Sequence, residues 1–187
     1  TYAATYNTVG GVTTLTGTNG VDSLTGGANT SDTLSGGGGI DTLVYSGGSD
    51  TLTGGAEVDV YDINALGTSA AHATVTTAAV DETIDLAGII DGGTLANVDY
   101  AAGATWQAQE VTLGSSATLA NYLDAASAGD GASGDEVLSW FEFGGNSYVV
   151  MDNTAGATFA ATDGVVQISG TTVLDDAAVA NGVITIA

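Results

Sequence analysis

The feature that most constrains the fold is a regular spacing of aspartates between residues 22 and 59. Asp32, Asp41, Asp50 and Asp59 follow one another at intervals of nine residues, and Asp22 lies ten residues before Asp32. Two positions after each aspartate stands a large apolar residue, and glycines open the segment before it. A pattern repeated at a short fixed interval predicts a solenoid, in which each unit folds alike and packs on its neighbours.

Each repeat unit is predicted to combine a glycine-rich turn with a short strand. In residues 36–44, GGGGIDTLV, the alternation of a strand buries Leu43 and turns its two neighbours outward. The glycines let the backbone adopt left-handed conformations and bring carbonyl oxygens close to one point. Two units complete one coil, so turns two units apart are expected to stack. The stacked pairs are Asp22 with Asp41, Asp41 with Asp59, and Asp32 with Asp50.

Stacked turns of this kind present the oxygen ligands that a hard cation prefers. Calcium binds six to eight oxygens of carboxylates and backbone carbonyls, at about 2.3 to 2.6 Å. We therefore predict up to three Ca²⁺ sites, one between the turns of each stacked pair. The predicted ligand residues are Asp22, Asp32, Asp41, Asp50 and Asp59, together with Gly17, Asn19, Gly20, Gly36, Gly38, Gly39, Gly48, Gly55 and Glu57. Thr30 stands where the repeat has glycine, so a weaker site is expected at that turn. The alternative interpretation of the whole segment is a glycine-rich linker or a repeat that no longer binds metal.

The charge of the chain also favours an external cation. There are 22 acidic residues and no lysine or arginine, for a net charge of -22. Self-repulsion opposes folding unless counter-ions bind, and three calcium ions would supply six positive charges. The same balance excludes nucleic acid as a partner, since phosphate binding needs a basic surface. No apolar run reaches the roughly 18 residues of a membrane helix, so no membrane insertion is expected, and without cysteine no disulfide or thiolate metal site is possible.

Beyond Asp59 the repeat gives way to a mixed pattern dominated by strands. Residues 74–91 predict a strand, a turn and a short strand. Residues 136–152 predict a β-hairpin joined through residues 144–146, GGN. Residues 164–174 and 182–187 predict further strands.

One helix is predicted in this second part of the chain. An apolar stripe at helical spacing follows Ser116, the predicted N-cap, and the helix is expected to end before Gly129. The chain is thus divided into a roll at residues 1–64 and a β-rich capping domain with one helix at residues 65–187. A solenoid exposes an unpaired coil at its end, and terminal units of another structure are expected to cover it.

Catalytic motifs are absent from the sequence. Neither H-E-x-x-H nor G-x-S-x-G occurs, and the single histidine, His72, is expected in a loop or at the surface. The carboxylate pairs Asp81 with Glu82 and Asp175 with Asp176 are expected to be solvated turn residues rather than acid-base groups. We therefore predict that the chain is not an enzyme.

Three further features have two interpretations each. Trp140, Phe141 and Phe143 could stack on sugars, but their strand positions favour core packing for some of them. Residues 129–136, GDGASGDE, could hold another calcium ion, although the spacing is not that of an EF-hand. Hydroxyl residues stand beside the buried position of each unit, at Thr14, Ser23, Thr33, Thr42 and Thr51. Threonine ladders occur in ice-binding solenoids, but threonine is also a good strand former, which is the interpretation we prefer.

The repeat resembles a known calcium-binding pattern. Units such as GTNGVDSLT, GGGGIDTLV and GGAEVDVYD are similar to G-G-x-G-x-D-x-U-x, the nine-residue repeat of the RTX (repeats-in-toxin) β-roll proteins. The stretches DETIDLAGI, WFEFGGNSYVVMDN and DGVVQISG resemble the region that follows the repeats in RTX surface-layer proteins and large RTX adhesins. This resemblance implies a mainly β fold, with a short parallel calcium β-roll (a β-solenoid) and a β-rich cap, and export through type I secretion by an uncleaved C-terminal signal.

The expected function is calcium-dependent folding and assembly of a secreted protein at a bacterial cell surface. Scarce cytosolic calcium would leave the roll unfolded for export, and millimolar calcium outside the cell would fold it. The expected partners are calcium ions and either a second copy of the chain or another cell-surface component. Two alternatives stay open: the C-terminal secretion tail of an RTX hydrolase whose catalytic part precedes Thr1, and a module that binds ice or glycan surfaces.

Overall fold

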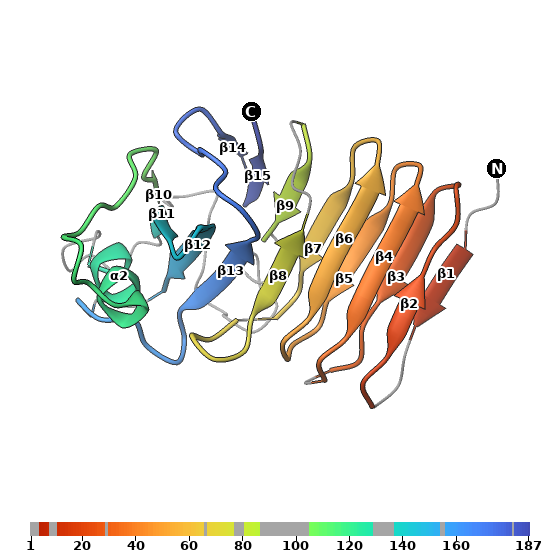
Figure 1. The fold of residues 1–187 in the computed structure, drawn as a ribbon, viewed down its shortest axis with the longest axis horizontal. Helices are drawn as coiled ribbons and strands as arrows, with labels where there is room; N and C mark the ends of the chain where they lie inside the picture. Colours follow the sequence, from red (N-terminus) through yellow and green to blue (C-terminus); the bar gives the residue numbers. More distant parts are fainter. Residues whose placement is uncertain are drawn as a thin grey trace.

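The fold consists of strands and one helix in the described part of the chain, so the prediction of a mainly β protein is confirmed (Figure 1). The computed structural model describes residues 4–7, 11–28, 30–65, 67–76, 81–86, 105–128, 137–153, 156–180 and 182–187. Residues 129–136, for which a further calcium ion was one of two interpretations, lie outside these ranges. No helix in the described ranges is long and apolar enough to cross a membrane.

The first nine strands form a β-solenoid. They are β1 (Ala4–Asn7), β2 (Thr14–Thr16), β3 (Asp22–Thr25), β4 (Thr33–Gly38), β5 (Thr42–Tyr45), β6 (Thr51–Ala56), β7 (Val60–Ile63), β8 (Ala73–Thr76) and β9 (Thr83–Asp85). Odd-numbered strands pair in parallel in one sheet and even-numbered strands pair in parallel in the other. Each coil therefore contributes one strand to each layer, as the repeat predicts.

The two layers enclose a ladder of apolar side chains. In one sheet the register aligns Leu24, Leu43 and Tyr61, and in the other it aligns Leu34 with Leu52. All five side chains are fully buried. Burying an aliphatic side chain of this size contributes about 1.5 to 3 kcal/mol, so the ladder supplies the cohesion that the glycine-rich turns lack.

Both sheets continue without interruption into the second part of the chain. The remaining strands are β10 (Thr105–Trp106), β11 (Val137–Phe143), β12 (Asn146–Asp152), β13 (Gly164–Ile168), β14 (Ala178–Ala180) and β15 (Val183–Thr185). The sheet orders are β1-β3-β5-β7-β9-β15-β14 and β10-β11-β12-β13-β8-β6-β4-β2. Strands β8 and β9, beyond residue 64, extend the coil, and β13 and β15 then pair with them. The division at residue 64 stays a prediction, and one core runs across it.

The predicted hairpin and helix both occur, and the helix begins later than predicted. Strands β11 and β12 pair through a two-residue turn at Gly144 and Gly145, both with positive φ. Helix α2 spans Leu119–Ala126, and its N-cap is Thr118, not Ser116. The Thr118 hydroxyl accepts from the Asn121 N–H at 3.3 Å, and the Asn121 amide oxygen accepts from the Thr118 N–H at 3.0 Å. This reciprocal pair satisfies two terminal donors, and Ser116 does not take that role.

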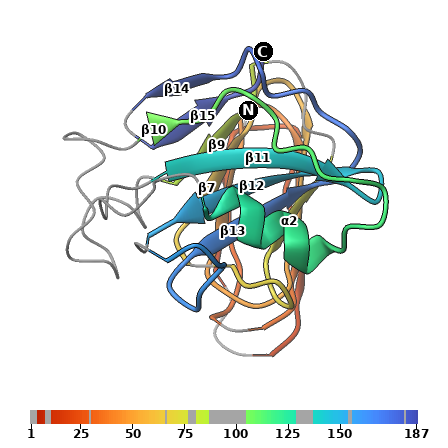
Figure 2. The same cartoon turned by 90° about the vertical axis from the view of Figure 1, so that its left-hand side faces the viewer.

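Helix α2 covers the outer face of the hairpin, as Figure 2 shows. Leu123 packs there with Phe141 and Tyr148, whose rings stack 5.1 Å apart. Trp140 points to the other face, into the core between the layers, and donates from its indole N–H to the Ala108 carbonyl at 2.9 Å. Phe143 is partly buried against the helix side. Core packing is thus confirmed for Trp140 and Phe141.

His72 lies in the loop before β8, as predicted. Its Nδ1 is 2.9 Å from the Thr68 carbonyl and its Nε2 is 3.2 Å from Oε1 of Gln167. Asp175 and Asp176 are exposed turn residues, which confirms that expectation for this pair.

The threonines beside the buried ladder fall on two faces. In the eight-stranded sheet, Thr14, Thr33, Thr51 and Thr74 stand in one row of the register, and Thr16, Ser35, Thr53 and Thr76 stand in a second row. Ser23 and Thr42 belong to the seven-stranded sheet. At the end of the second row, the Thr53 and Thr76 hydroxyls bond to each other at 2.5 Å. These rows are the cross-strand ladders that stabilise a sheet face.

Candidate metal centre

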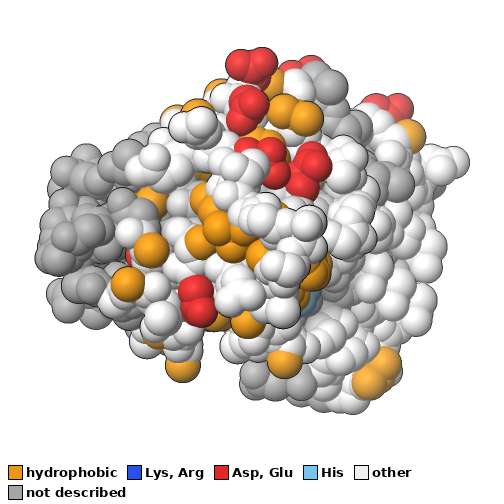
Figure 3. Space-filling model, turned by 60° about the vertical axis from the view of Figure 1, so that its left-hand side comes forward, with side chains coloured by type: hydrophobic (Ala, Val, Ile, Leu, Met, Phe, Trp, Pro, Cys, Tyr) orange, Lys and Arg blue, Asp and Glu red, His pale blue; other side chains and the backbone are white. Residues whose placement is uncertain are grey.

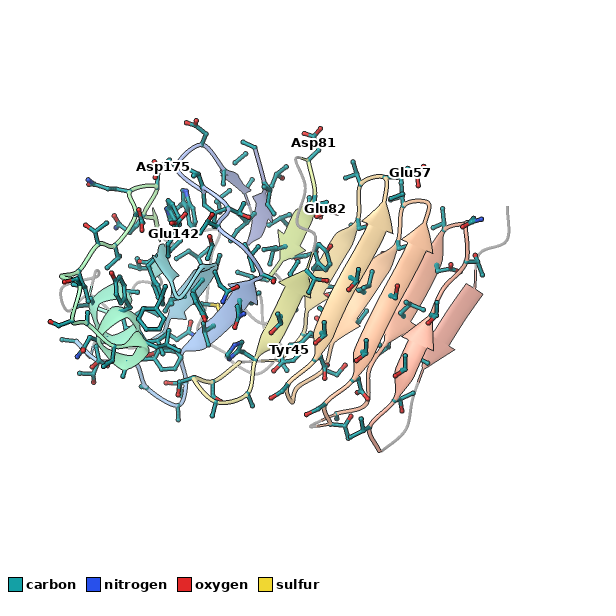
Figure 4. The ribbon with its side chains drawn as sticks, viewed as in Figure 1. Tyr45, Glu57, Asp81, Glu82, Glu142 and Asp175 are labelled. Atoms are coloured by element: carbon teal, nitrogen blue, oxygen red, sulfur yellow. The ribbon has the colours of Figure 1, made fainter. Side chains whose placement is uncertain are left out.

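The repeat turns stack in two columns along opposite edges of the solenoid. We call turns 17–22, 36–41 and 54–59 the first turn column, and turns 26–32 and 46–50 the second turn column. Figure 4 places Glu57 on the edge of the first column and Tyr45 on the opposite edge. Strand pairing sets the turns in register, because the strands after the turns of a column are neighbours in one sheet.

One carboxylate oxygen of each later aspartate binds the backbone of the coil before it. The N–H groups of Asp22, Asp41 and Asp32 donate at 2.8 Å to Oδ1 of Asp41, Asp59 and Asp50, respectively. Thr13 donates in the same way to Oδ1 of Asp32 at 2.7 Å. The structure therefore brings together the three aspartate pairs that the repeat spacing predicts, whereas their role as metal ligands stays a prediction.

The second carboxylate oxygen, Oδ2, divides the aspartates into two groups. In the first turn of each column, a threonine donates to this atom. Oδ2 of Asp22 accepts from the Thr18 N–H at 2.5 Å and from the Thr18 hydroxyl at 2.9 Å. Oδ2 of Asp32 accepts from the Thr30 hydroxyl at 2.7 Å. The Oδ2 atoms of Asp41, Asp50 and Asp59 are buried and accept no hydrogen bond from the described part of the chain. Burying a charged oxygen without a partner is costly, so these three atoms require a cation or a proton.

The pKa values of these carboxyl groups also show that burial disfavours their charged form. Burial raises the pKa of Asp50 to about 6, against the hydrogen bond from the Asp32 backbone and with some help from the Asp32 charge. Burial likewise raises the pKa of Asp41 and Asp59, and the neighbouring charge of Glu57 adds to it. No lysine or arginine exists to reverse these shifts.

Backbone oxygens and the free carboxylate oxygens meet where the glycines leave room. A Cβ on Gly36 would overlap Oδ2 of Asp41 and lie 2.7 Å from the Gly54 carbonyl oxygen of the next turn. A Cβ on Gly26 would lie 3.0 Å from Oδ2 of Asp32 and 3.2 Å from that of Asp50. At Gly17, Gly26 and Gly36, oxygens from two coils thus meet in the space that the missing side chain leaves.

These oxygen-lined spaces fit a calcium ion. The donors are all oxygen, carboxylates together with the Gly36 and Gly54 carbonyls, and oxygen is the ligand that calcium prefers. Within the described ranges no group of three or more His, Asp or Glu side chains converges. Backbone carbonyls must therefore supply most of the ligands. A bound divalent ion would neutralise the buried Oδ2 charges.

Most of the remaining predicted ligands belong to the turns of the first column. A Cβ on Gly38 would lie 3.5 Å from Asn19 Oδ1 and 3.8 Å from Glu57 Oε2, so these three positions are neighbours. Glu57 takes the place of a repeat glycine with φ 72, and its Oε2 accepts from the Gly39 N–H at 2.5 Å. Gly17, Gly20 and Gly55 have only backbone atoms to offer, and their role as ligands stays a prediction.

Two residue types that the repeat motif does not contain also reach the columns. Glu82 is fully buried, which overturns the expectation of a solvated turn residue, whereas its neighbour Asp81 is exposed. The Tyr45 hydroxyl donates to the Gly48 carbonyl at 2.9 Å, and burial together with the Asp50 charge raises the pKa of Tyr45 to about 12. Tyr45 stands at the opening position of its unit, where the other units have Gly17, Gly26, Gly36 and Gly54, and this replacement was the signal in the sequence for such a contact.

A methyl group at Gly48 is expected to disrupt the second column. Gly48 has φ +103, and its Cβ would overlap the Thr30 carbonyl of the neighbouring turn. We expect Gly48→Ala to lower the free energy of unfolding by at least about 2 kcal/mol in calcium buffer, measured by urea unfolding. Gly114→Ala is the control, because a Cβ there meets nothing within 4 Å. A Gly48→Ala chain as stable as the control would contradict the turn geometry.

Similarity to known proteins is found at the level of the fold and not of the sequence. No model of a known protein family matches the sequence, and no curated protein matches it. Among solved structures, the chain is similar to the solution structure of the AlgE6R3 subunit from the Azotobacter vinelandii mannuronan C5-epimerase. The two are 18% identical with a TM-score of 0.46, and the match covers 84% of this chain and 70% of that one.

Proposed function

We propose that this chain is a calcium-dependent folding and assembly module of a protein that type I secretion exports to a bacterial cell surface. The observation that carries the proposal is the set of buried Oδ2 atoms at Asp41, Asp50 and Asp59, without hydrogen-bond partners in the described residues. Since the chain has no lysine or arginine, a proton or an external cation must supply the missing charge. At neutral pH a hard divalent cation suits the oxygen-lined turns.

The same turns would make folding depend on the calcium concentration, which differs between the inside and the outside of a cell. Without a divalent ion, the stacked carboxylates repel one another and the roll is disfavoured, which suits passage through a narrow channel as an unfolded chain. In millimolar calcium the binding free energy becomes folding free energy. Figure 3 shows a face with acidic side chains and neither lysine nor arginine, so divalent ions are also suited to bringing two such surfaces together.

Calcium is therefore expected to raise the stability of the chain strongly. Each site at about 100 times its Kd contributes about 2.7 kcal/mol, so three sites should raise Tm by more than about 10 °C. The measurement is thermal unfolding by circular dichroism in millimolar CaCl₂ and in excess EGTA, with MgCl₂ as the matched control ion. Identical melting curves in CaCl₂ and EGTA would refute the calcium account.

The assembly part of the proposal has its own measurement. Light scattering and electron microscopy in CaCl₂ are expected to show calcium-dependent filaments or lattices of the folded chain. Monomers at every calcium concentration would limit the function to calcium-dependent folding.

A further inference from the structure

The first turn column continues past the last repeat aspartate to Glu82. Strand β9 pairs in parallel with β7, and the Thr83 N–H donates to the Asp59 carbonyl at 3.1 Å. Earlier in the column the Val60 N–H donates to the Asp41 carbonyl in the same way, at 2.9 Å. Glu82 therefore takes the position that follows Asp59 in the column, on the same edge as Glu57 in Figure 4. In the second column the corresponding residue after Asp50 is Ala73, which has no carboxylate.

The groups between Asp59 and Glu82 all present oxygen. Asp59 is fully buried, its Oδ2 lies against Gly54, and that atom accepts no hydrogen bond from the described residues. The Gly54 N–H donates to the Tyr61 hydroxyl at 3.2 Å, and this hydroxyl donates to Glu82 Oε2 at 3.5 Å. Asp59 thus lies against Gly54, and the Tyr61 hydroxyl connects that same glycine to Glu82; both carboxyl groups are fully buried.

No basic side chain of this protein can balance these two carboxylates. The sequence has neither lysine nor arginine, and the single histidine is held by Thr68 and Gln167 in another loop. Two carboxyl groups buried at neighbouring positions must be protonated or compensated by a cation, and one divalent ion would balance both charges when they are ionised. Hard oxygen donors select a calcium-type ion over a transition metal.

We propose that Asp59 and Glu82 form a cation site at the junction between the solenoid and the C-terminal strands, which takes Ca²⁺ in addition to the ions of the repeat turns. This junction site rests on the proposed function, because it extends the same column. It differs from the repeat sites in its chemistry: one ligand is a glutamate outside the nine-residue repeat, and a tyrosine hydroxyl lies beside it.

The junction site would tie the C-terminal strand to the roll. The Glu82 carbonyl accepts from the Ile186 N–H at 3.0 Å, and the Asp81 N–H donates to the Ile186 carbonyl at 2.8 Å. Strand β9 pairs with β15 on the side opposite to β7. An ion held by Glu82 therefore orders the segment that carries β15, so calcium controls the exposure of the chain's last residues.

The experiment compares Glu82→Gln with Asp81→Asn in the full 187-residue chain. Glutamine keeps the shape of Glu82 and removes its charge. Asp81 is the matched control, because it is the adjacent carboxylate, is exposed, and has φ 72, which asparagine tolerates. Native mass spectrometry in calcium counts the bound ions, and hydrogen exchange of residues 183–186 reports the order of β15 with and without calcium.

The natural chain and Asp81→Asn are expected to hold one calcium ion more than Glu82→Gln. Calcium should slow exchange at residues 183–186 at least about tenfold in the first two and much less in Glu82→Gln, while residues 42–45 stay protected in all three. An unchanged ion count and unchanged protection in Glu82→Gln would overturn the junction site alone. Absence of calcium binding by the natural chain would overturn the proposed function with it. If Glu82→Gln does not fold, Tyr61→Phe serves as the second variant, and an unaltered affinity of the last ion would count against the site.

Discussion

Replacing Asp41 by asparagine is expected to weaken two calcium sites, whereas replacing Asp50 by asparagine weakens one. Asp41 stands between Asp22 and Asp59, while Asp50 has a carboxylate neighbour only at Asp32. Asparagine keeps an oxygen for the backbone N–H of the preceding coil and removes the charge of the unpartnered Oδ2. Loss of groups that merely support a metal ligand lowers affinity about 10- to 100-fold, so loss of a ligand charge should lower it at least that much.

The measurement is calcium titration by isothermal calorimetry, with bound ions counted by native mass spectrometry. We expect the Asp41→Asn chain to lose two binding steps and the Asp50→Asn chain to lose one. Asp163→Asn is the control for a buried aspartate outside the columns, since both its oxygens accept backbone N–H groups, from Asn153 at 3.0 Å and Ala160 at 2.6 Å. It should lower stability without changing the ion count. Equal losses from Asp41→Asn and Asp50→Asn would contradict the stacking of the first column.

The repeat spacing predicted the geometry of the columns because a nine-residue unit leaves little freedom. Each unit has one turn and one short strand, so the position of Leu24 fixes that of Leu43 and Tyr61 in the same sheet. Each aspartate stands two positions before the aligned apolar residue, so the same register also aligns the aspartates. Even the extra residue before Asp32 changes no pairing, since the turn absorbs it.

Glu82 could not be found in this way because the spacing changes after β7. The connection from β7 to β8 runs from residue 64 to residue 72, whereas that from β5 to β6 runs from 46 to 50. A count of nine therefore no longer locates the next turn. The position of Glu82 beside Asp59 depends on the pairing of β9 with β7, a long-range contact. From the sequence alone, Glu82 next to the hydrophilic Asp81 resembled a solvated pair.

The continuity of the sheets was missed for a related reason. Turn-rich sequence between strands indicates local structure but not which distant strand completes a sheet edge. Here the open end of each sheet is covered by a strand from the chain's last quarter: β13 on β8, and β15 on β9. The cap is therefore a continuation of the roll's own layers, with Ile168 beside Val75 and Ile184 beside Ile84.

Acid is expected to replace calcium in stabilising the roll. Burial raises the pKa of Asp50 to about 6 and raises that of Asp41 and Asp59, while an unfolded aspartate titrates near 3.9. Between about pH 4 and pH 6 the folded chain then binds more protons than the unfolded chain, so stability falls as pH rises through this window. In EGTA, Tm should be higher at pH 4.5 than at pH 7.5.

Calcium is expected to reverse this dependence, because the ion needs deprotonated carboxylates and competes with protons for them. In millimolar CaCl₂, Tm should therefore be higher at pH 7.5 than at pH 4.5. The Asp50→Asn chain separates the local effect from general charge repulsion: in EGTA at pH 7.5 it should melt above the natural chain, since its buried group carries no charge. Two results would contradict this account: a Tm of the natural chain in EGTA that is highest at pH 7.5, or an Asp50→Asn chain with a lower Tm than the natural chain at that pH. Either would show that the charges of the buried carboxylates are compensated by other groups. Tm is thus expected to change with pH in opposite directions with and without calcium, because the same Oδ2 atoms accept either a proton or a metal ion.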